Sequence, residues 1–271
     1  MQSLSPIVAA TDFSVPAGRA VRRAALIAQQ IGAEMHLLHV VSPLDLYPGP
    51  DPAADFSLNH QQALQAAVKN RLDIQADSLR KDFSIPVVAA TRIGRTHKEI
   101  VDYAAAKSAG LVVSGARGES TLLDLLMGST AARLLRLAAC PVLIVKNREV
   151  KPYQIVLAAV DFSPGSSHVL ELARAVATEA RIEVLHVYDT DHDDRMRQSG
   201  MDEGFILGRQ ERILKDAEYQ LDIELGRLND GKISRHVMAA YPAAAICECV
   251  STLKADLIVL GRHGKSGMQE L

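Results

Sequence analysis

The sequence repeats itself once, and this repeat limits the possible folds more than any other feature. The stretch IVAATDFS at 7–14 returns as VLAAVDFS at 156–163, and LLHVV at 37–41 returns as VLHVY at 184–188. A third pair, AGLVVSGARG at 109–118 and ADLIVLGRHG at 255–264, follows in the same order. The offset stays between 146 and 149 residues, which chance matches of short apolar strings would not do. The chain is therefore two copies of one domain.

Within each copy, short β-branched strings alternate with longer segments of helical periodicity. In the first copy we expect strands at 7–11, 34–41, 86–91, 111–114 and 141–146, separated by helices at 16–31, at 58–83, from Thr96 and from Ser129. Such alternation predicts α/β domains with a doubly wound parallel sheet, Rossmann-like, with helices on both faces. We predict two tandem domains, 1–148 and 152–271, joined through the polar segment 146–154.

Composition excludes several classes of protein. Hydrophobic residues make up 48% and charged residues 23%, as in ordinary globular proteins, and the formal net charge is −2 with scattered Lys and Arg, so we expect no nucleic-acid partner. No apolar run approaches the roughly 20 residues that span a bilayer, and no basic leader begins the chain, so we expect a cytoplasmic protein without membrane contact. Cys140, Cys247 and Cys249 lack zinc-ligand spacing, so we predict no metal site built from protein ligands.

Ligands of parallel sheets bind at the carboxyl ends of the strands, in the crevice where strand order reverses. Thr11 and Asp12 follow the first predicted strand, Val40 ends the second and Gly115 follows the fourth. We expect these positions to converge on one pocket. A carboxylate at Asp12 suits a ribose hydroxyl, and it equally suits capping of the helix that begins near Ser14.

His39 recurs as His186 at the equivalent position of the second copy. Each histidine flanks a strand end, so we expect a hydrogen-bonded structural residue and not a catalytic one. We find no Ser-His-Asp set and no pair of carboxylates that repeats at the strand ends.

The segment 115–130 carries the spacing G-x2-G-x9-G-S-T, from Gly115 and Gly118 to Gly128, Ser129 and Thr130. Glycines after a strand let backbone N–H groups approach an anion, and a helix N-terminus favours phosphate. Taken separately, a strand-ending glycine and a Ser-Thr pair predict only a turn and a helix cap. The combined spacing is more specific. It is neither the P-loop, which needs a lysine, nor the G-x-G-x-x-G of dinucleotide folds.

This spacing resembles the ATP-binding signature of the universal stress protein family. The similarity extends to TDFS at 11–14, LLHV at 37–40, GRTHKEI at 94–100 and CPVLIVK at 140–146. The resemblance implies that ATP is the cofactor, with Mg or Mn held mainly through its phosphates and water. It further implies two groups of contacts: Ala10, Thr11, Asp12 and Val40 near adenine and ribose, and Gly115, Gly118, Gly128, Ser129 and Thr130 near ribose and phosphates. We also assign Gly94 to the site, since a glycine there lets a loop approach the adenine, although a plain turn would give the same residue.

The second copy departs from this pattern. Ala240 replaces Gly94 and Ala243 replaces His97, and the third glycine of the motif would fall three residues beyond Leu271. We expect the second domain to lack the helix and strand that close the first, and we assign it a doubtful site at Asp161, Val187, Gly261 and Gly264. The acidic stretch YDTDHDDRMRQ at 188–198 invites a metal site, but a solvated loop is the expected structure.

These observations predict an ATP-binding regulatory protein of the stress response, with at most slow hydrolysis. The expected partners are an adenine nucleotide, a further protein, and either a second copy of the chain or the other domain, since the strand at 141–146 offers an edge for pairing. One alternative is a dimerisation module whose nucleotide site is vestigial. Another is a true ATPase or nucleotidyl transferase, which would need an added catalytic group.

Overall fold

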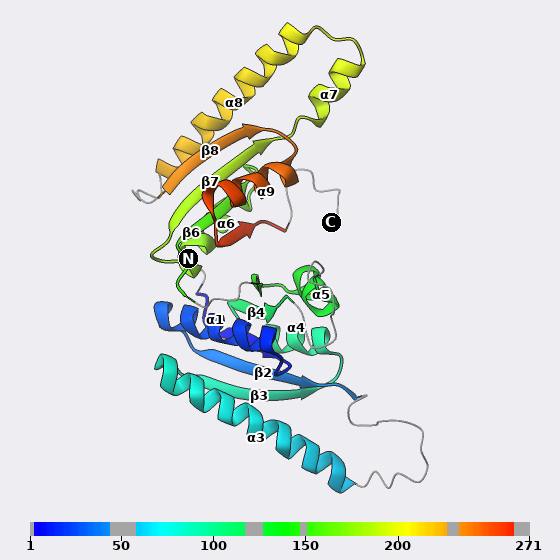
Figure 1. Ribbon diagram of the computed structural model, residues 1–271, viewed down its shortest axis with the longest axis vertical. Coiled ribbons are helices and arrows are strands. Elements are labelled where there is room, and N and C mark those ends of the chain that lie inside the picture. Colours follow the sequence, from blue (N-terminus) through cyan, green and yellow to red (C-terminus); the bar gives the residue numbers. More distant parts are fainter. Residues whose placement is uncertain (1–2, 44–57, 117–126, 147–150, 227–232, 263–271) are drawn as a thin grey trace. The chain divides into compact units, whose positions relative to one another are not determined.

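The computed structural model describes residues 3–43, 58–116, 127–146, 151–226 and 233–262 (Figure 1). Contacts within the chain divide it between Lys151 and Pro152 into two compact units. Each unit contains its own parallel sheet with helices packed against it. The predicted fold class, two tandem doubly wound domains, is confirmed.

The sheet of the first unit has five strands in the order β3-β2-β1-β4-β5, all parallel. The strands are β1 (Ile7–Thr11), β2 (Met35–Val41), β3 (Val87–Ile93), β4 (Leu111–Gly115) and β5 (Val142–Val145). All five residues of β4 are buried, as expected of a strand covered on both faces. The apolar strings of the sequence predicted this sheet because its strands are hydrophobic on both sides.

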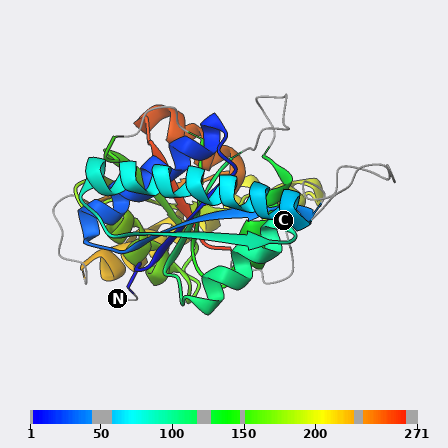
Figure 2. The same cartoon turned by 90° about the horizontal axis from the view of Figure 1, so that it is seen from below.

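Helices cover both faces of this sheet. The helices α1 (Val15–Ile31) and α3 (Leu58–Phe83) pack against each other and against one face, and α4 (Thr96–Ala106) packs with α5 (Ser129–Leu137) on the other. Figure 2 shows α3 and α1 on one side of the sheet and α4 on the opposite side. Side chains of a strand point alternately to the two faces of the sheet. Val8, Leu38 and Val112 belong to the face that α4 and α5 cover, and they form one buried cluster with residues of both helices.

Strand order reverses at β1, and in parallel sheets such a reversal is where a ligand-binding crevice is expected. β1 pairs with β2 on one side, through Thr11 and His39, and with β4 on the other, through Ala9 and Val113. The chain therefore leaves β1 and β4 in opposite directions at the carboxyl edge of the sheet. Thr11 and Gly115, the last residues of the two strands, lie beside this crevice.

The second unit repeats the same order in β8-β7-β6-β9, again with all strands parallel. Its strands are β6 (Ile155–Val160), β7 (Arg181–Tyr188), β8 (Ile233–Ala239) and β9 (Leu257–Leu260). Its helices are α6 (Ser166–Val176), α7 (Asp191–Gln198), α8 (Glu203–Gly226) and α9 (Pro242–Leu253). The described residues of this unit thus match the first four strands of the other sheet.

The acidic stretch of the second unit is helical, and the prediction of a solvated loop was wrong there. Asp193 lies within α7 and is fully buried. Its Oδ1 accepts hydrogen bonds from the Tyr188 hydroxyl at 2.9 Å and from Arg209 at 2.7 Å, and its Oδ2 accepts one from Gln210 at 2.7 Å. Arg209 and Gln210 lie 16 and 17 residues after Asp193, so no local pattern in the sequence indicates that this carboxylate is buried. The carboxylate fastens α7 to α8 and β7.

The two units begin their first helix differently. Ser14 is the N-cap of α1, and its Oγ accepts a hydrogen bond from the amide of Ala17 at 3.2 Å. The N-cap of α6 is Gly165, which supplies no side-chain bond, although Ser163 stands where Ser14 stands in the first copy. One serine therefore caps its helix and the equivalent serine does not.

We expect Ser14→Ala to lower the free energy of unfolding by about 1 kcal/mol, because the Ala17 amide loses its acceptor. Ser163→Ala, the matched change, should stay within about 0.5 kcal/mol of the parent protein. Urea unfolding followed by circular dichroism measures both. Equal losses in the two variants would contradict this account of the first turn.

Candidate functional site

The segment after β1 holds Asp12 in a tight turn at the edge of the crevice. The amide of Ser14 donates to Asp12 Oδ1 at 3.0 Å, and the amide of Phe13 donates to Thr11 Oγ1 at 3.0 Å. Phe13 has a φ of 63°, an uncommon conformation for a residue with a side chain. Asp12 is exposed, and its Oδ2 has no partner within the described segments. The turn therefore leaves one carboxylate oxygen for a ligand.

The structure bears on one of the two interpretations of Asp12 made from the sequence, its role at the start of α1, and leaves its carboxylate open for the other. Its carboxylate does organise the start of α1, through the Ser14 amide, although the cap itself is Ser14. The same carboxylate is open to solvent beside the strand reversal. One residue can thus serve both roles.

His39 has a structural role, as its sequence pattern predicted. Its Nδ1 donates to the carbonyl oxygen of Thr11 at 2.8 Å, and its ring stacks on Phe13 with 4.5 Å between centroids. In the second unit, His186 Nδ1 donates to the Val160 carbonyl at 2.9 Å, and its ring lies 4.2 Å from that of Phe162. The carbonyl can only accept, so it fixes the tautomer of each ring. Each histidine fastens the turn after one strand to the neighbouring strand.

Ala10 and Val40 lie on the face of the sheet that α4 and α5 cover. Both pack against the buried cluster of that face and both remain partly exposed near the carboxyl ends of β1 and β2. They offer a small apolar surface next to Asp12. A flat, apolar base suits such a surface.

The start of α5 is the most informative local structure in the site. Gly128 is the N-cap, its amide donates to the Ala116 carbonyl at 2.8 Å, and no side chain caps the helix. The alternative in which Ser129 and Thr130 merely cap this helix is wrong, because both lie inside its first turn. The first bond within the helix runs from the Ala132 amide to the Gly128 carbonyl at 3.1 Å. The amides of Ser129, Thr130 and Ala131 therefore have no carbonyl partner within the helix. A helix start with free amides and two hydroxyls is the kind of structure that favours an anion, so it is a candidate phosphate site.

Gly115 ends the buried strand β4, and the Ala116 amide continues its pairing by donating to the Val145 carbonyl at 3.0 Å. The bond from the Gly128 amide to the Ala116 carbonyl then holds the start of α5 close to the end of β4. Gly118, the middle glycine of the motif, lies outside the described residues.

Gly94 ends β3 in a conformation that favours glycine. Its φ is 154°, its amide donates to the Val41 carbonyl at 3.1 Å, and a Cβ there would lie 2.8 Å from Glu99 Cγ. In the second copy, alanines occupy both positions, as Ala240 and Ala245, and Ala240 is not among the described residues with positive φ. Gly94 and Glu99 therefore form a matched pair at the start of α4.

Basic side chains gather where α4 and α5 begin. Arg133 of α5 and His97 of α4 approach to 3.5 Å between Nη1 and Nδ1, and Arg95 is the N-cap of α4. Partial burial lowers the pKa of His97 below its ordinary value, and the positive charges of Arg133 and Arg95 lower this pKa further. Sequence reasoning missed this cluster, because Arg95 and Arg133 stand 38 positions apart. Only the packing of α4 on α5 brings them together.

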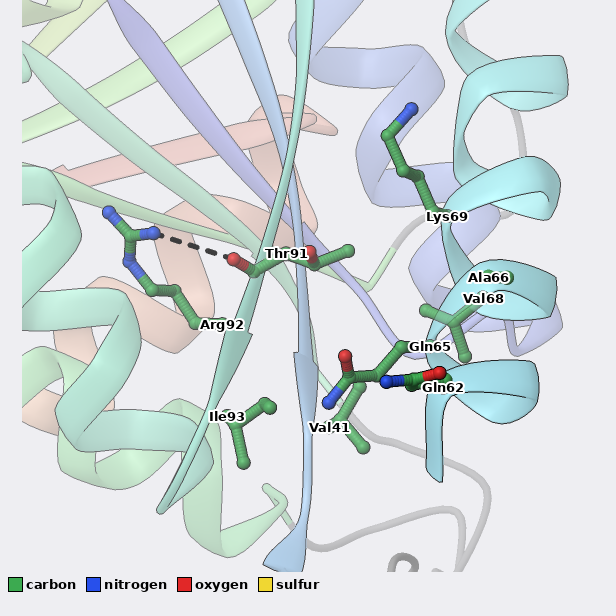
Figure 3. A pocket seen from close by; sticks show the side chains of 9 residues that line it. All are labelled: Val41, Gln62, Gln65, Ala66, Val68, Lys69, Thr91, Arg92 and Ile93. Carbon is green, nitrogen blue, oxygen red and sulfur yellow. Dashed lines mark hydrogen bonds between the residues drawn. The ribbon is translucent and has the colours of Figure 1, made fainter. Parts of the chain in front are cut away.

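A cavity of about 460 Å³ lies elsewhere in the first unit, between α3 and β3 (Figure 3). Gln62, Gln65 and Lys69 line it from α3, while Val41 and Ile93 line it from the sheet. Arg92 points away from α3, and its Nη1 lies 3.5 Å from the Thr91 carbonyl. None of the predicted nucleotide-binding residues lines this cavity. A helix N-terminus and an exposed carboxylate mark the crevice as the better candidate.

Comparison with known proteins places both units in one family. A family profile described as the universal stress protein family matches residues 4–146 and again 152–271. The chain belongs to the universal stress protein family. A universal stress protein of Mycolicibacterium smegmatis is 30% identical over 268 residues, which cover 96% of this chain and 88% of that protein.

Further relatives agree with this assignment. A universal stress protein of Methanocaldococcus jannaschii is 31% identical over 143 residues, or 52% of this chain and 81% of that one. The crystal structure of a universal stress protein from Archaeoglobus fulgidus matches with a TM-score of 0.66 at 18% identity, covering 95% of this chain and 86% of that chain. This last likeness shows the fold.

The second universal stress protein domain has a different site. Asp161 Oδ1 accepts hydrogen bonds from the Ser163 amide at 3.0 Å and from Ser166 Oγ at 3.2 Å, and the residue is only half-exposed. Val187 is half-buried at the end of β7 and Gly261 is exposed after β9, while Gly264 lies outside the described residues. The carboxylate is thus more fully engaged than that of Asp12.

Two further properties of the described residues limit the chemistry. They contain no group of three or more His, Cys, Asp or Glu side chains arranged to hold a metal ion. None of their helices is both long enough and apolar enough to cross a membrane.

We expect Gly94→Ala to lower the free energy of unfolding by about 1–3 kcal/mol, because the new Cβ meets Glu99 and the backbone conformation is strained. Ala240→Gly in the second domain should cost at most about 1 kcal/mol, through added freedom of the unfolded chain. Thermal unfolding of both variants checks the difference. A Gly94→Ala protein as stable as the parent would show that this turn does not require glycine.

Proposed function

We propose that the first domain binds ATP in the crevice between the carboxyl ends of β1 and β4. Ala10 and Val40 contact the adenine, Asp12 accepts hydrogen bonds from the ribose, and the start of α5 at Gly128, Ser129 and Thr130 binds the phosphates. Thr11 and Gly94 contribute on the adenine and ribose side, and the motif glycines Gly115 and Gly118 contribute on the ribose and phosphate side.

The start of α5 carries this proposal. Its cap is a glycine without a side chain, its first turn presents two hydroxyls, and no side chain of the described residues caps it. Several helices of the chain lack a side-chain cap, but α5 combines this with two hydroxyls in its first turn and a start beside the carboxyl end of β4. A phosphate supplies the acceptor that the helix lacks.

ATP acts here chiefly as a ligand that alters contacts with partners. His39 and His186 hold backbone carbonyls through Nδ1, so their rings serve the fold. Hydrolysis, where it occurs, is slow. A divalent ion such as Mg or Mn would be held through phosphate oxygens and water.

Partner binding involves the edge of the first sheet. β5 pairs with β4 on one side, and its other side pairs with no strand in the described part of the chain. An open edge favours addition of another strand. We propose that a second copy of the chain or the other domain covers it, and that nucleotide binding changes the contacts of this assembly.

Isothermal calorimetry with ATP tests the site through a matched pair of variants. Asp12→Asn keeps an oxygen for the Ser14 amide but loses the negative acceptor for ribose, so we expect affinity to fall about tenfold or more. Asp161→Asn, the equivalent change in the second domain, should leave both affinity and stoichiometry unchanged. The parent protein should bind about one ATP per chain, as expected if only the first site is competent.

Two results would contradict the proposal. Equal loss in both variants would place the binding elsewhere, and no binding by the folded parent protein would favour a dimerisation module with a vestigial site. Circular dichroism of each variant confirms that it is folded.

A further inference from the structure

We propose that Arg133 and His97, together with Arg95, bind the terminal phosphates and make the first site selective for nucleoside triphosphates over monophosphates. This inference rests on the proposed function, because it concerns the phosphate end of the same site. It adds residues outside the glycine motif.

Helix geometry places the Arg133 guanidinium beside the proposed phosphate site. Arg133 stands four residues after Ser129, so both lie on the same face of α5 one turn apart. Side chains on a helix lean toward its N-terminus, which brings the Arg133 guanidinium toward the first turn. The 3.5 Å approach between Arg133 Nη1 and His97 Nδ1 shows that α4 contributes to the same place.

Among the described residues, the cations at this corner are not balanced by carboxylates. Within the described segments, neither Arg95 nor Arg133 has a carboxylate partner, and both are exposed. Glu99 lies in the first turn of α4 beside Gly94 and forms no ion pair with them there. The positive ends of two helix dipoles point toward these cations, since α4 and α5 both begin here without a side-chain cap. A polyanion relieves this repulsion, which is otherwise unfavourable.

The second domain provides an internal comparison. Tyr241 and Ala243 stand where the first domain has Arg95 and His97. The Tyr241 hydroxyl donates to Asp194 Oδ2, so an acidic group replaces the basic cluster at the start of α9. Asp194 is in turn paired with Arg197 at 2.9 Å, so this corner of the second domain holds a balanced ion pair where the first domain has cations without described carboxylate partners. Polyphosphate suits only the first.

The expected ligand follows from charge. At neutral pH a nucleoside triphosphate carries roughly two more negative charges than its monophosphate, and these lie at the end farthest from the base. Contacts at the start of α5 serve both ligands. Contacts with Arg133 and His97 require the longer phosphate chain, which reaches between the two helices.

Calorimetry with ATP and with AMP tests this selectivity in the full-length chain. We expect the parent protein to bind ATP more tightly than AMP, and Arg133→Gln to lower ATP affinity about tenfold while AMP affinity changes less than about threefold. His97→Gln should act in the same direction with a smaller effect. Arg136→Gln removes the same charge from the last turn of α5 and should leave both affinities nearly unchanged.

The outcomes separate this inference from the proposed function. Retained AMP binding by Arg133→Gln shows that its site is folded. If AMP and ATP bind equally to the parent protein, or Arg133→Gln weakens both alike, the selectivity is overturned and the nucleotide site stands. If Arg136→Gln weakens ATP as much as Arg133→Gln, the effect is general charge attraction and the inference is wrong. If the folded parent protein binds neither nucleotide, both proposals fail.

Discussion

Strand β1 pairs with β2 along one side and with β4 along the other, and this pairing positions every residue of the candidate site. Because the chain leaves β1 and β4 in opposite directions, the turn at Asp12 and the start of α5 face one crevice. Buried β1 residues such as Ile7 and Val8 make the pairing stable, since they are covered on both faces. The position of the proposed nucleotide site is a consequence of this topology.

The sequence predicted the strands and helices of the first domain and the family, because the repeat and the apolar periodicity report features that are local in the chain, but it missed α7. Asp193 shows where such reasoning failed, since its burial depends on Arg209 and Gln210, which lie in another helix. The interpretation of Ser129 and Thr130 as a cap of α5 was also wrong, because a Ser-Thr pair does not reveal whether it precedes the helix or begins it. Contacts between α4 and α5 lay beyond any local pattern.

The two copies share one fold but differ in the side chains around the candidate site. The pairing of His39 with the Thr11 carbonyl recurs as His186 with the Val160 carbonyl, so the scaffold of the turn is retained in both domains. The groups around it differ: Asp161 is engaged by Ser166, and Tyr241 with Asp194 replaces the basic corner. Scaffold contacts survive because both domains need them to fold, whereas ligand contacts are free to diverge.

The central claim is that nucleotide binds at the crevice of the first domain and not at its counterpart in the second. Hydrogen–deuterium exchange of the full chain with saturating ATP tests it directly. The account predicts slower exchange in peptides that cover 9–14 and 127–134, with peptides that cover 156–163 and 233–262 unchanged. Slowing at 156–163 alone, or around the α3 cavity alone, would contradict it, because the ligand would then bind away from the start of α5.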